Sequence, residues 1–317
     1  MKRLERIQTL PKNIDDFIDE IGLNMQKLYG PLARKDYLQR AKRGIAANIS
    51  HPGINTYGII ESGNAHALLF GIVRNGVGEI AFIHVLSKSK GKGYESRLLD
   101  EAVKDFRKAG IGGIVCETIL NSGLVLHDSL APLGFRHFSR ELMHCSLHKN
   151  GPLPSASHRP RPLTPGDWKP AAQCIVSAYQ NHPGRFLHSE VQVERRALDF
   201  ISRVQAGNYG QVRAAYSQCL YHDAVCVGVI LGASVAPDVG FILQVAVHPD
   251  YQRRGAGEVL IYGLREAFLQ EGLSRIALGV TLDNPARELY LRLGFEPLHS
   301  IDTYAWWEDF DQTLQGA

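Results

Sequence analysis

The 317-residue sequence has few cysteines, little net charge and no long apolar run, and each shortage excludes a class of protein. The five cysteines are scattered and form no CxxC pair, so we expect reduced thiols in a core rather than disulfides. A net charge of +3 is too small to indicate a nucleic-acid partner. The thirteen histidines are dispersed and show no metal-ligand spacing, so we expect no metal site.

Membrane and secretory signals are also lacking. No apolar run reaches the roughly 18 residues that a membrane span requires. The basic residues at the start are followed by no apolar core, which argues against a secretory signal. We therefore expect a cytoplasmic protein without membrane partners, and the length allows one to three globular domains.

Residues 241–268 contain the most informative pattern. The apolar run Phe241–Val247 predicts a buried strand. The loop Gln252–Gly257, written QRRGAG, follows, and then a helix begins whose apolar residues, among them Leu260 and Leu264, share one face. A strand, a glycine-bearing loop and a helix start thus follow one another directly.

This arrangement predicts a site for an anion. The first amides of a helix have no partner within the helix and carry the positive end of its dipole. Gly255 and Gly257 have no side chains to hold a phosphate away, and Arg253 and Arg254 add positive charge. We expect a pyrophosphate here. A P-loop GxxxxGK[ST] and a dinucleotide-binding GxGxxG are both absent, which argues against those nucleotide sites.

The QRRGAG loop resembles the acyl-CoA loop of the GNAT acetyltransferases, usually written Q/R-x-x-G-x-G/A. A second stretch, Asn284–Phe295 with the sequence NPARELYLRLGF, resembles the family's later helix and lies where the family places it. The resemblance implies an α/β (α+β) fold with a mixed, mainly antiparallel sheet flanked by helices. It also implies acetyl-CoA as co-substrate and no metal.

The resemblance assigns roles to individual residues. It implies that Tyr290 protonates the leaving sulfur, although this tyrosine could instead be an ordinary half-buried aromatic residue. Asn284 matches a pantetheine contact and could equally cap the helix that follows. The implied cofactor-binding residues, by backbone or side chain, are Val245, Val247, Gln252, Arg253, Arg254, Gly255, Ala256, Gly257 and Asn284.

The general base stays open. Many family members place a glutamate where this sequence has Phe241, which cannot accept a proton. A chain of waters is one alternative, and the remaining side-chain candidates are Asp238, His222, His188 and His248. The loop 182–186 is expected to border the acceptor site, where it either contributes Arg185 or Phe186 or is a plain loop.

The sequence also repeats. Shifting it by 162 residues lays Val85 on Val247 and Gly93 on Gly255, and LGF recurs at 133–135 and 293–295. This predicts a duplicated domain: a first GNAT-like lobe at 1–150, a proline-rich linker at 151–158 and a second lobe at 159–317. The organisation is similar to that of mycothiol synthase, without a shared substrate motif.

The two lobes differ at the positions that carry the chemistry. Glu95 stands where the second lobe has Gly257, and Leu130 stands where it has Tyr290. A carboxylate beside a pyrophosphate costs on the order of several kcal/mol even at an effective dielectric constant of about 20. We therefore expect the first lobe to be degenerate, with a structural or substrate-shaping role, and the second lobe to be catalytic.

These observations predict an N-acetyltransferase that moves an acetyl group from acetyl-CoA directly to the primary amine of a small molecule, as a monomer or homodimer. A small acceptor is favoured because the first lobe would wall off one side of the acceptor cleft. Two alternatives remain, a protein or peptide N-acetyltransferase and a CoA-binding regulatory protein without turnover. The sequence does not identify the acceptor, because acceptor pockets are built from variable loops.

Overall fold

The structure is a computed structural model that describes residues 2–49, 51, 53–117, 125–147, 159–180 and 182–308, without the side chain of Pro183. The chain divides into two compact units. Unit 1 consists of residues 1–139 and 301–317, and unit 2 consists of residues 140–300. The predicted linker at 151–158 lies outside the described residues.

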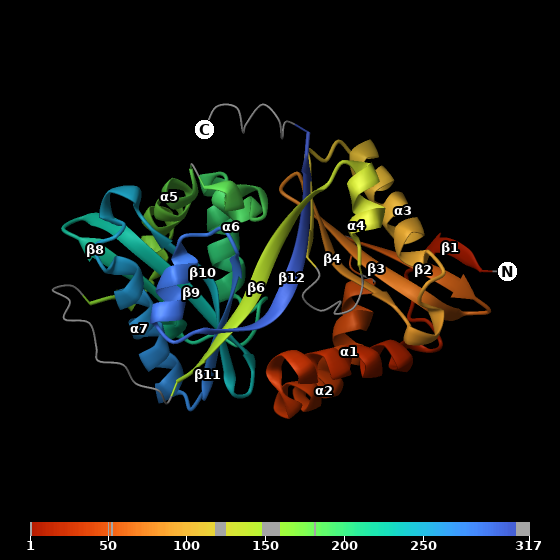
Figure 1. Cartoon of the computed structure of the whole chain (residues 1–317), viewed down its shortest axis with the longest axis horizontal. Coiled ribbons are helices and arrows are strands. Elements are labelled where there is room, and N and C mark those ends of the chain that lie inside the picture. Colours follow the sequence, from red (N-terminus) through yellow and green to blue (C-terminus); the bar gives the residue numbers. More distant parts are fainter. Residues whose placement is uncertain are drawn as a thin grey trace. The chain divides into compact units, whose positions relative to one another are not determined.

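Unit 1 contains an antiparallel meander followed by a helix and a parallel strand (Figure 1). Its sheet has the order β1-β2-β3-β4-β5-β12, and only the β4–β5 pair is parallel. Its helices and strands are β1 (Arg3–Arg6), α1 (Ile14–Tyr29), α2 (Pro31–Ile49), β2 (Ile54–Glu61), β3 (Asn64–Arg74), β4 (Val77–Val85), α3 (Tyr94–Lys108), β5 (Gly113–Glu117) and α4 (His127–Leu130).

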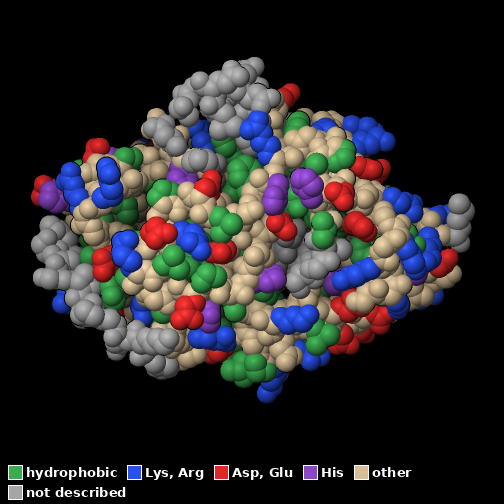
Figure 2. All heavy atoms as spheres, viewed as in Figure 1, with side chains coloured by type: hydrophobic (Ala, Val, Ile, Leu, Met, Phe, Trp, Pro, Cys, Tyr) green, Lys and Arg blue, Asp and Glu red, His purple; other side chains and the backbone are tan. Residues whose placement is uncertain are grey.

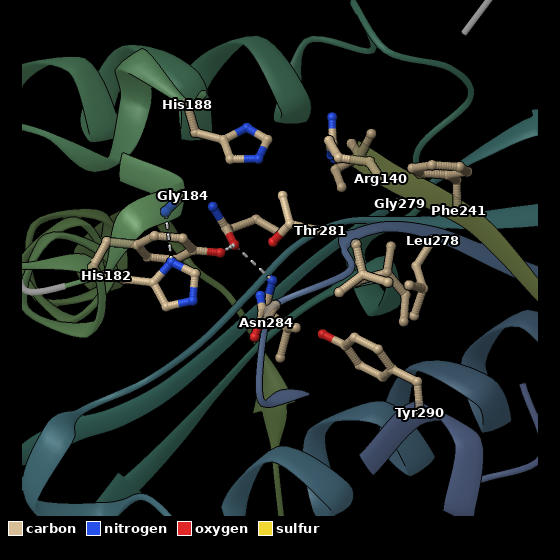
Figure 3. A pocket seen from close by; sticks show the side chains of 16 residues that line it. Arg140, His182, Gly184, His188, Phe241, Leu278, Gly279, Thr281, Asn284 and Tyr290 are labelled. Atoms are coloured by element: carbon tan, nitrogen blue, oxygen red, sulfur yellow. Dashed lines mark hydrogen bonds between the residues drawn. The ribbon is translucent and has the colours of Figure 1, made fainter. Parts of the chain in front are cut away.

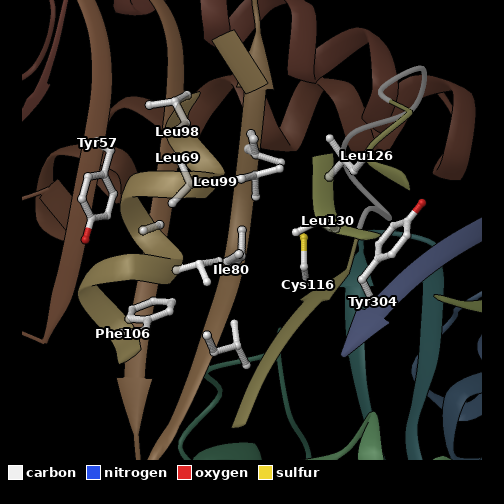
Figure 4. Close-up of a cluster of buried hydrophobic side chains, with 14 of the residues drawn as sticks. Tyr57, Leu69, Ile80, Leu98, Leu99, Phe106, Cys116, Leu126, Leu130 and Tyr304 are labelled. Atoms are coloured by element: carbon white, nitrogen blue, oxygen red, sulfur yellow. The ribbon is translucent and has the colours of Figure 1, made fainter. Parts of the chain in front are cut away.

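The alternation of side chains along these strands separates two cores. Leu69 packs with α3 in one hydrophobic cluster, whereas its neighbour Leu68 packs with α1 in another. Because successive strand residues point to opposite faces, α3 and α1 cover opposite faces of the sheet. Figure 4 shows the α3 side, where Leu98, Leu99 and Phe106 face the strands.

Unit 2 repeats this plan with the sheet order β6-β11-β10-β9-β8-β7, in which only β10 and β11 are parallel. Ile230 packs with α7, whereas Val229 and Leu231 pack with α5 and α6, so these helices cover opposite faces. Its elements are β7 (Arg161–Pro162), α5 (Trp168–Tyr179), α6 (Glu194–Gln205), β8 (Ser217–His222), β9 (Val225–Ala236), β10 (Val239–Val247), α7 (Ala256–Gln270), β11 (Arg275–Thr281) and α8 (Ala286–Arg292).

Two long strands are divided between the units. β6 (Arg136–Ser146) begins in unit 1, and its residues 140–146 pair with β11 in unit 2. β12 (Glu296–Trp307) begins in unit 2, and its residues 303–307 pair with β5 in unit 1. The unit boundaries, at 139/140 and 300/301, therefore differ from those of the predicted lobes 1–150 and 159–317. The predicted lobes follow one another along the chain, and such a division cannot describe two strands that each contribute to both units.

The same β-bulge occurs in both units. In β4, Ala81 is the extra residue between Ile80 and Phe82, which pair with adjacent residues of β3. In β10, Leu243 is the extra residue between Ile242 and Gln244. Ala81 and Leu243 are 162 residues apart, the shift that the sequence repeat predicts. A bulge re-aims the strand that carries it, so both units turn the end of this strand in the same way.

A second shared device lies in the cores. The ring of Phe106 fills the space above Gly71 and Gly78, where an added Cβ would stand 2.7 Å from a ring carbon in each case. The ring of Phe268 packs on Gly232 and Gly240, where an added Cβ would stand 3.1 and 2.3 Å from ring carbons, and Leu264 shares the space above Gly232. In both units a phenylalanine from the helix thus reaches the sheet backbone through a gap made by two glycines.

The fold class is as predicted, α/β with a mixed, mainly antiparallel sheet between helices in each unit. On the face shown in Figure 2, acidic and basic side chains are interspersed, in keeping with a net charge of +3. Within the described part of the chain, no helix combines the length and the apolar character needed to cross a membrane.

Candidate active site

The site lies in unit 2, where β10 and β11 separate. The two strands pair in parallel only between residues 239–242 and 275–278, although β10 continues to Val247 and β11 to Thr281. The Leu243 bulge begins where this pairing ends. A cavity of about 640 Å³ opens beyond this point, between the end of β10, the start of α7 and α8.

The loop before α7 forms one wall of this larger cavity. Gly255 precedes the first residue of the helix with φ +85°, a conformation that glycine adopts without strain. Arg253 also has a positive φ, 59°. An added Cβ on Gly257 would come within 3.3 Å of Leu289 Cδ2, so its missing side chain leaves the helix start open. The free amides of the first turn of α7 can therefore be approached closely by an anion.

The structure brings most of the predicted site residues to this one cavity. Val245, Val247, Gln252, Arg253, Gly255, Ala256, Gly257, Asn284 and Tyr290 all line it. Arg254 lies outside the lining, and its guanidinium sits over the Tyr251 ring, 5.5 Å from the centroid. Gln252 extends back toward the strand, where its Nε2 donates to the Val247 carbonyl at 3.0 Å.

The end of β10 turns backbone groups toward the opening. The His248 amide donates to the Val227 carbonyl of β9 at 2.9 Å. Hydrogen-bonded pairs alternate in an antiparallel ladder, so Ala246 faces β9 in the same way, while Val245 and Val247 direct their amides to the other edge. The Val245 amide there donates to Oε1 of Gln244 at 3.0 Å.

Gln244 links this amide to a tyrosine. Its Oε1 also accepts a hydrogen bond from the Tyr179 hydroxyl at 3.0 Å, so one buried oxygen joins α5 to the end of β10. The pKa of Tyr179 is raised to about 12, first by burial and then by the charge of Glu190, while the charge of Arg140 and the hydrogen bond to Gln244 oppose the rise. Tyr179 therefore stays protonated at neutral pH.

Tyr290 is buried on α8, with its ring edge against Phe295 and its hydroxyl pointing into the space beside Asn284 (Figure 3). Burial, and after it the neighbouring Tyr179, raise the pKa of Tyr290 above the ordinary value of a tyrosine. The phenol is thus held protonated, as a proton donor must be.

Asn284 and His182 lie beside the two tyrosines, and hydrogen bonds fix both side chains. Asn284 Oδ1 accepts a hydrogen bond from the Ala286 amide at 2.9 Å, which is the helix-capping role considered for it. His182 Nδ1 accepts from the Gly184 amide at 2.9 Å, so that nitrogen carries no proton. Burial lowers the pKa of His182, and a hydrogen bond with Asn284 opposes this.

A second, smaller cavity of about 70 Å³ adjoins the first. The two cavities share Tyr179, His182, Val245, Asn284 and Tyr290 as lining residues. The smaller one is further lined by Arg140, His188, Phe241 and Thr281 (Figure 3). The loop 182–186 borders it through His182 and Gly184, whereas Arg185 bonds to the Gln180 carbonyl and Phe186 is buried in the protein.

Of the four side chains considered as general base, His188 alone lines the smaller cavity. Its Nδ1 lies 3.4 Å from Oε1 of Glu190. Asp238 pairs with Arg275 at the other end of β10, and His222 lies against Tyr251. His248 accepts a hydrogen bond from the Asp250 amide in the turn after β10.

Two residues of this site, Tyr179 and Arg140, were not predicted from the sequence. Tyr179 is the last residue of α5, and no motif marks it. Arg140 belongs to the first half of the chain in sequence, and only the exchange of β6 brings it to unit 2. The family resemblance could not have found either residue, because neither lies in one of the two matching stretches.

The family model of the GNAT acetyltransferases matches residues 185–295. These residues form a GNAT acetyltransferase domain. The match covers both predicted stretches, the QRRGAG loop and the later helix. A GNAT domain transfers acyl groups, which places the chain among the acyltransferases. A search of curated protein sequences finds no match to the chain.

Solved structures extend the likeness beyond the GNAT domain. A GCN5-related N-acetyltransferase from Sphaerobacter thermophilus has a TM-score of 0.68 at 15% identity, with 96% of each chain covered. A tandem GNAT protein from the clavulanic acid biosynthesis pathway has a TM-score of 0.59 at 16% identity, covering 96% of this chain and 99% of that one. The fold of the chain is therefore that of a tandem GNAT protein.

Among the residues that the structure describes, no group of three or more His, Cys, Asp or Glu side chains is placed to hold a metal ion. The five cysteines are all buried, and none of them forms a disulfide.

Proposed function

We propose that unit 2 transfers an acetyl group from acetyl-CoA to the primary amine of a small molecule by direct attack. The observation that carries this proposal is the junction of the two cavities. The larger cavity begins at the loop suited to a pyrophosphate, and the smaller one contains His188. A thioester at the junction would lie beside Tyr290 and Val245, which line both.

On the donor side, the amides that follow Arg254 hold the pyrophosphate, with Arg253 adding charge. Asn284 and Val247 lie along the path of the pantetheine arm between this loop and the junction. The Val245 amide polarises the thioester carbonyl. Its present acceptor, the Gln244 oxygen at 3.0 Å, shows that an oxygen is accommodated in front of this amide.

Two groups manage the protons. His188 removes a proton from the attacking amine, and the carboxylate of Glu190 orients its ring. Burial raises the pKa of Glu190, but the hydrogen bond and charge of His188 outweigh it, so the pKa is lowered and the carboxylate remains ionised. When the tetrahedral intermediate collapses, Tyr290 donates its proton to the CoA sulfur. The acetyl–sulfur bond breaks as the acetyl–nitrogen bond remains.

A small-molecule acceptor is favoured by the size of the smaller cavity, about 70 Å³. The experiment that tests the function is release of CoA thiol from acetyl-CoA in the presence of a panel of small primary amines, and separately of peptides. Amine-dependent release is expected with small amines. Acetylation of peptides alone would establish the alternative peptide substrate, and binding of acetyl-CoA without any release would indicate a regulatory CoA-binding protein.

The base is tested with His188→Gln, which keeps polarity and approximate size but cannot accept a proton at neutral pH. We expect kcat/KM for the amine to fall by about 10²-fold. The loss should shrink as the pH rises toward the amine's own pKa, because the free amine then needs no base. His299→Gln, at an exposed position of β12, is the control. A loss that does not vary with pH would contradict the role of His188.

A further inference from the structure

The smaller cavity has an unusual charge for a site that receives an amine. Arg140, His182 and His188 line it, and none of its described lining residues is an aspartate or glutamate. A protonated amine is repelled by an arginine, so a cavity built only to attract an ammonium group would place a carboxylate there. The fixed positive charge in this lining belongs to Arg140, because the pKa of His182 is lowered and His188 lies against the carboxylate of Glu190. The Arg140 end of the cavity therefore suits an anionic group on the acceptor.

The position of Arg140 is fixed by the sheet. It lies opposite Thr281 in the β6–β11 ladder, and its side chain is only 6% exposed. Gly279, two residues before Thr281, points to the same face of β11. An added Cβ at Gly279 would stand 3.0 Å from Nη2 of Arg140, so the absence of a side chain there gives the guanidinium its space.

The guanidinium also lies close enough to act on the junction. The charge of Arg140 lowers the pKa of Tyr179, against the larger effect of burial. Figure 3 shows Arg140 beside Phe241 and Gly279, on the side of the cavity away from His182. A guanidinium presents a planar fork of donors that matches a carboxylate in a two-point contact.

We propose that Arg140 binds a carboxylate of the acceptor, so that the acceptor is a small amine that also carries a carboxylate, of the amino-acid class. This inference rests on the proposed acetyl transfer. With its carboxylate on Arg140, the amine of such an acceptor is directed to the junction of the cavities, near His188 and Tyr290. Arg140 also disfavours the ammonium form of the amine, which is the form that cannot attack.

The test compares acceptors that differ only in the anionic group. Rates of thiol release are measured for the protein-building L-amino acids and glycine, for their carboxamides and for the matching decarboxylated amines. We expect the best amino acid to exceed its carboxamide and its decarboxylated amine by about 10²-fold in kcat/KM. The amine of the carboxamide is less basic, so more of it is in the free form at neutral pH. If the protein did not recognise the carboxylate, the carboxamide would therefore react faster. A best acceptor without an anionic group would overturn the inference.

Variants of Arg140 and Gly279 test whether Arg140 causes the preference for an acceptor with a carboxylate. In Arg140→Ala the ratio of acid to carboxamide should fall by about 10²-fold toward one, while KM for acetyl-CoA stays near the wild-type value. Arg140→Lys should retain part of the ratio, because it keeps the charge without the fork. Gly279→Ala should lower the ratio, because its Cβ displaces the guanidinium. An unchanged ratio in Arg140→Ala would overturn the inference, and since each ratio is internal to one preparation, partial misfolding does not affect it.

Arg213→Ala is the matched control. It also removes one arginine from unit 2, here an exposed one that pairs with Glu271 at 3.2 Å, and it should leave the ratio unchanged.

A separate measurement distinguishes this inference from the proposed function. If the wild-type protein acetylates no amine, the proposed function fails. Binding of N-acetylglycine and of N-acetylglycinamide is then compared by calorimetry with CoA present. Tighter binding of the acid, lost in Arg140→Ala, would support the carboxylate site, and equal binding of the two would overturn it.

Discussion

The loops 90–95 and 252–257 occupy the same place in two copies of one fold. Each follows a strand that carries a bulge, and each has a glycine in the left-handed conformation directly before its helix, Gly93 with φ 66° and Gly255 with φ 85°. After that glycine the loops differ. Unit 1 continues with Tyr94-Glu95, whereas unit 2 continues with Ala256-Gly257.

The difference changes what the helix start can hold. Glu95 lies in the first turn of α3, and its Oε2 is buried without a hydrogen-bond partner. Gly257 has no side chain and lines the larger cavity of unit 2. Leu130 is fully buried in the core of unit 1, whereas the hydroxyl of Tyr290 points into a cavity. The backbone devices are thus shared, and the chemistry depends on a few side chains. We propose that unit 1 neither binds acetyl-CoA nor transfers acetyl groups.

The largest expected effect comes from removing the phenol that unit 1 lacks. Tyr290→Phe keeps the buried ring and should lower kcat by about 10²–10⁴-fold, because the leaving thiolate loses its proton donor. KM for acetyl-CoA should change little. Thiol release with the preferred amine measures both. Tyr262→Phe, on α7 beside Arg265, is the control. Acetylation at the wild-type rate would refute the role of Tyr290.

The shared core device should respond alike in both units. Phe268→Ala and Phe106→Ala each remove a ring that packs on two glycines, so each should lower the free energy of unfolding of its own unit by about 3–5 kcal/mol. Native-state hydrogen exchange of the strand amides measures each unit separately. Leu298→Ala, at an exposed position, should cost less than about 0.5 kcal/mol. A loss in one unit only would show that the repeated packing is not equivalent.

One residue of the unit 1 loop can be introduced into the loop of unit 2. Gly257→Glu gives unit 2 the carboxylate of unit 1 and should weaken acetyl-CoA binding by about 10²-fold through repulsion and bulk. Gly257→Ala separates the two causes: it adds bulk without charge, 3.3 Å from Leu289, and should have a much smaller effect. Calorimetry gives affinity and stoichiometry, and we expect one acetyl-CoA per wild-type chain. Two equal sites would contradict the proposed difference between the units.

The sequence predicts what depends on local pattern. The expected strand at 241–247 is found at Val239–Val247, and the helix expected directly after the QRRGAG loop is found at Ala256–Gln270. The QRRGAG loop could be interpreted because its glycines, its preceding strand and its following helix are contiguous. The 162-residue repeat relates the positions of β4 and β10, and both strands carry the bulge.

The acceptor side depends on contacts that local pattern does not contain. Arg140 and Gly279 meet only because β6 pairs with β11, and Tyr179 reaches the site through its bond to Gln244. The sequence names His188 as one of several candidate bases. Only the three-dimensional structure distinguishes it from Asp238 and His248, because His188 lines the smaller cavity and they do not. The same is true of the exchange of strands between the units, which a reading in chain order cannot detect.

That exchange has a consequence for synthesis. β5 of unit 1 pairs with residues 303–307, which the ribosome adds only after all of residues 140–300 have been made. The nascent first half must therefore wait with one side of β5 uncovered, and exposed strand edges are prone to pair with other chains. A messenger interrupted before codon 301 would yield a polypeptide that lacks the closing strand of its earliest-made sheet, although every residue of unit 2 would be present.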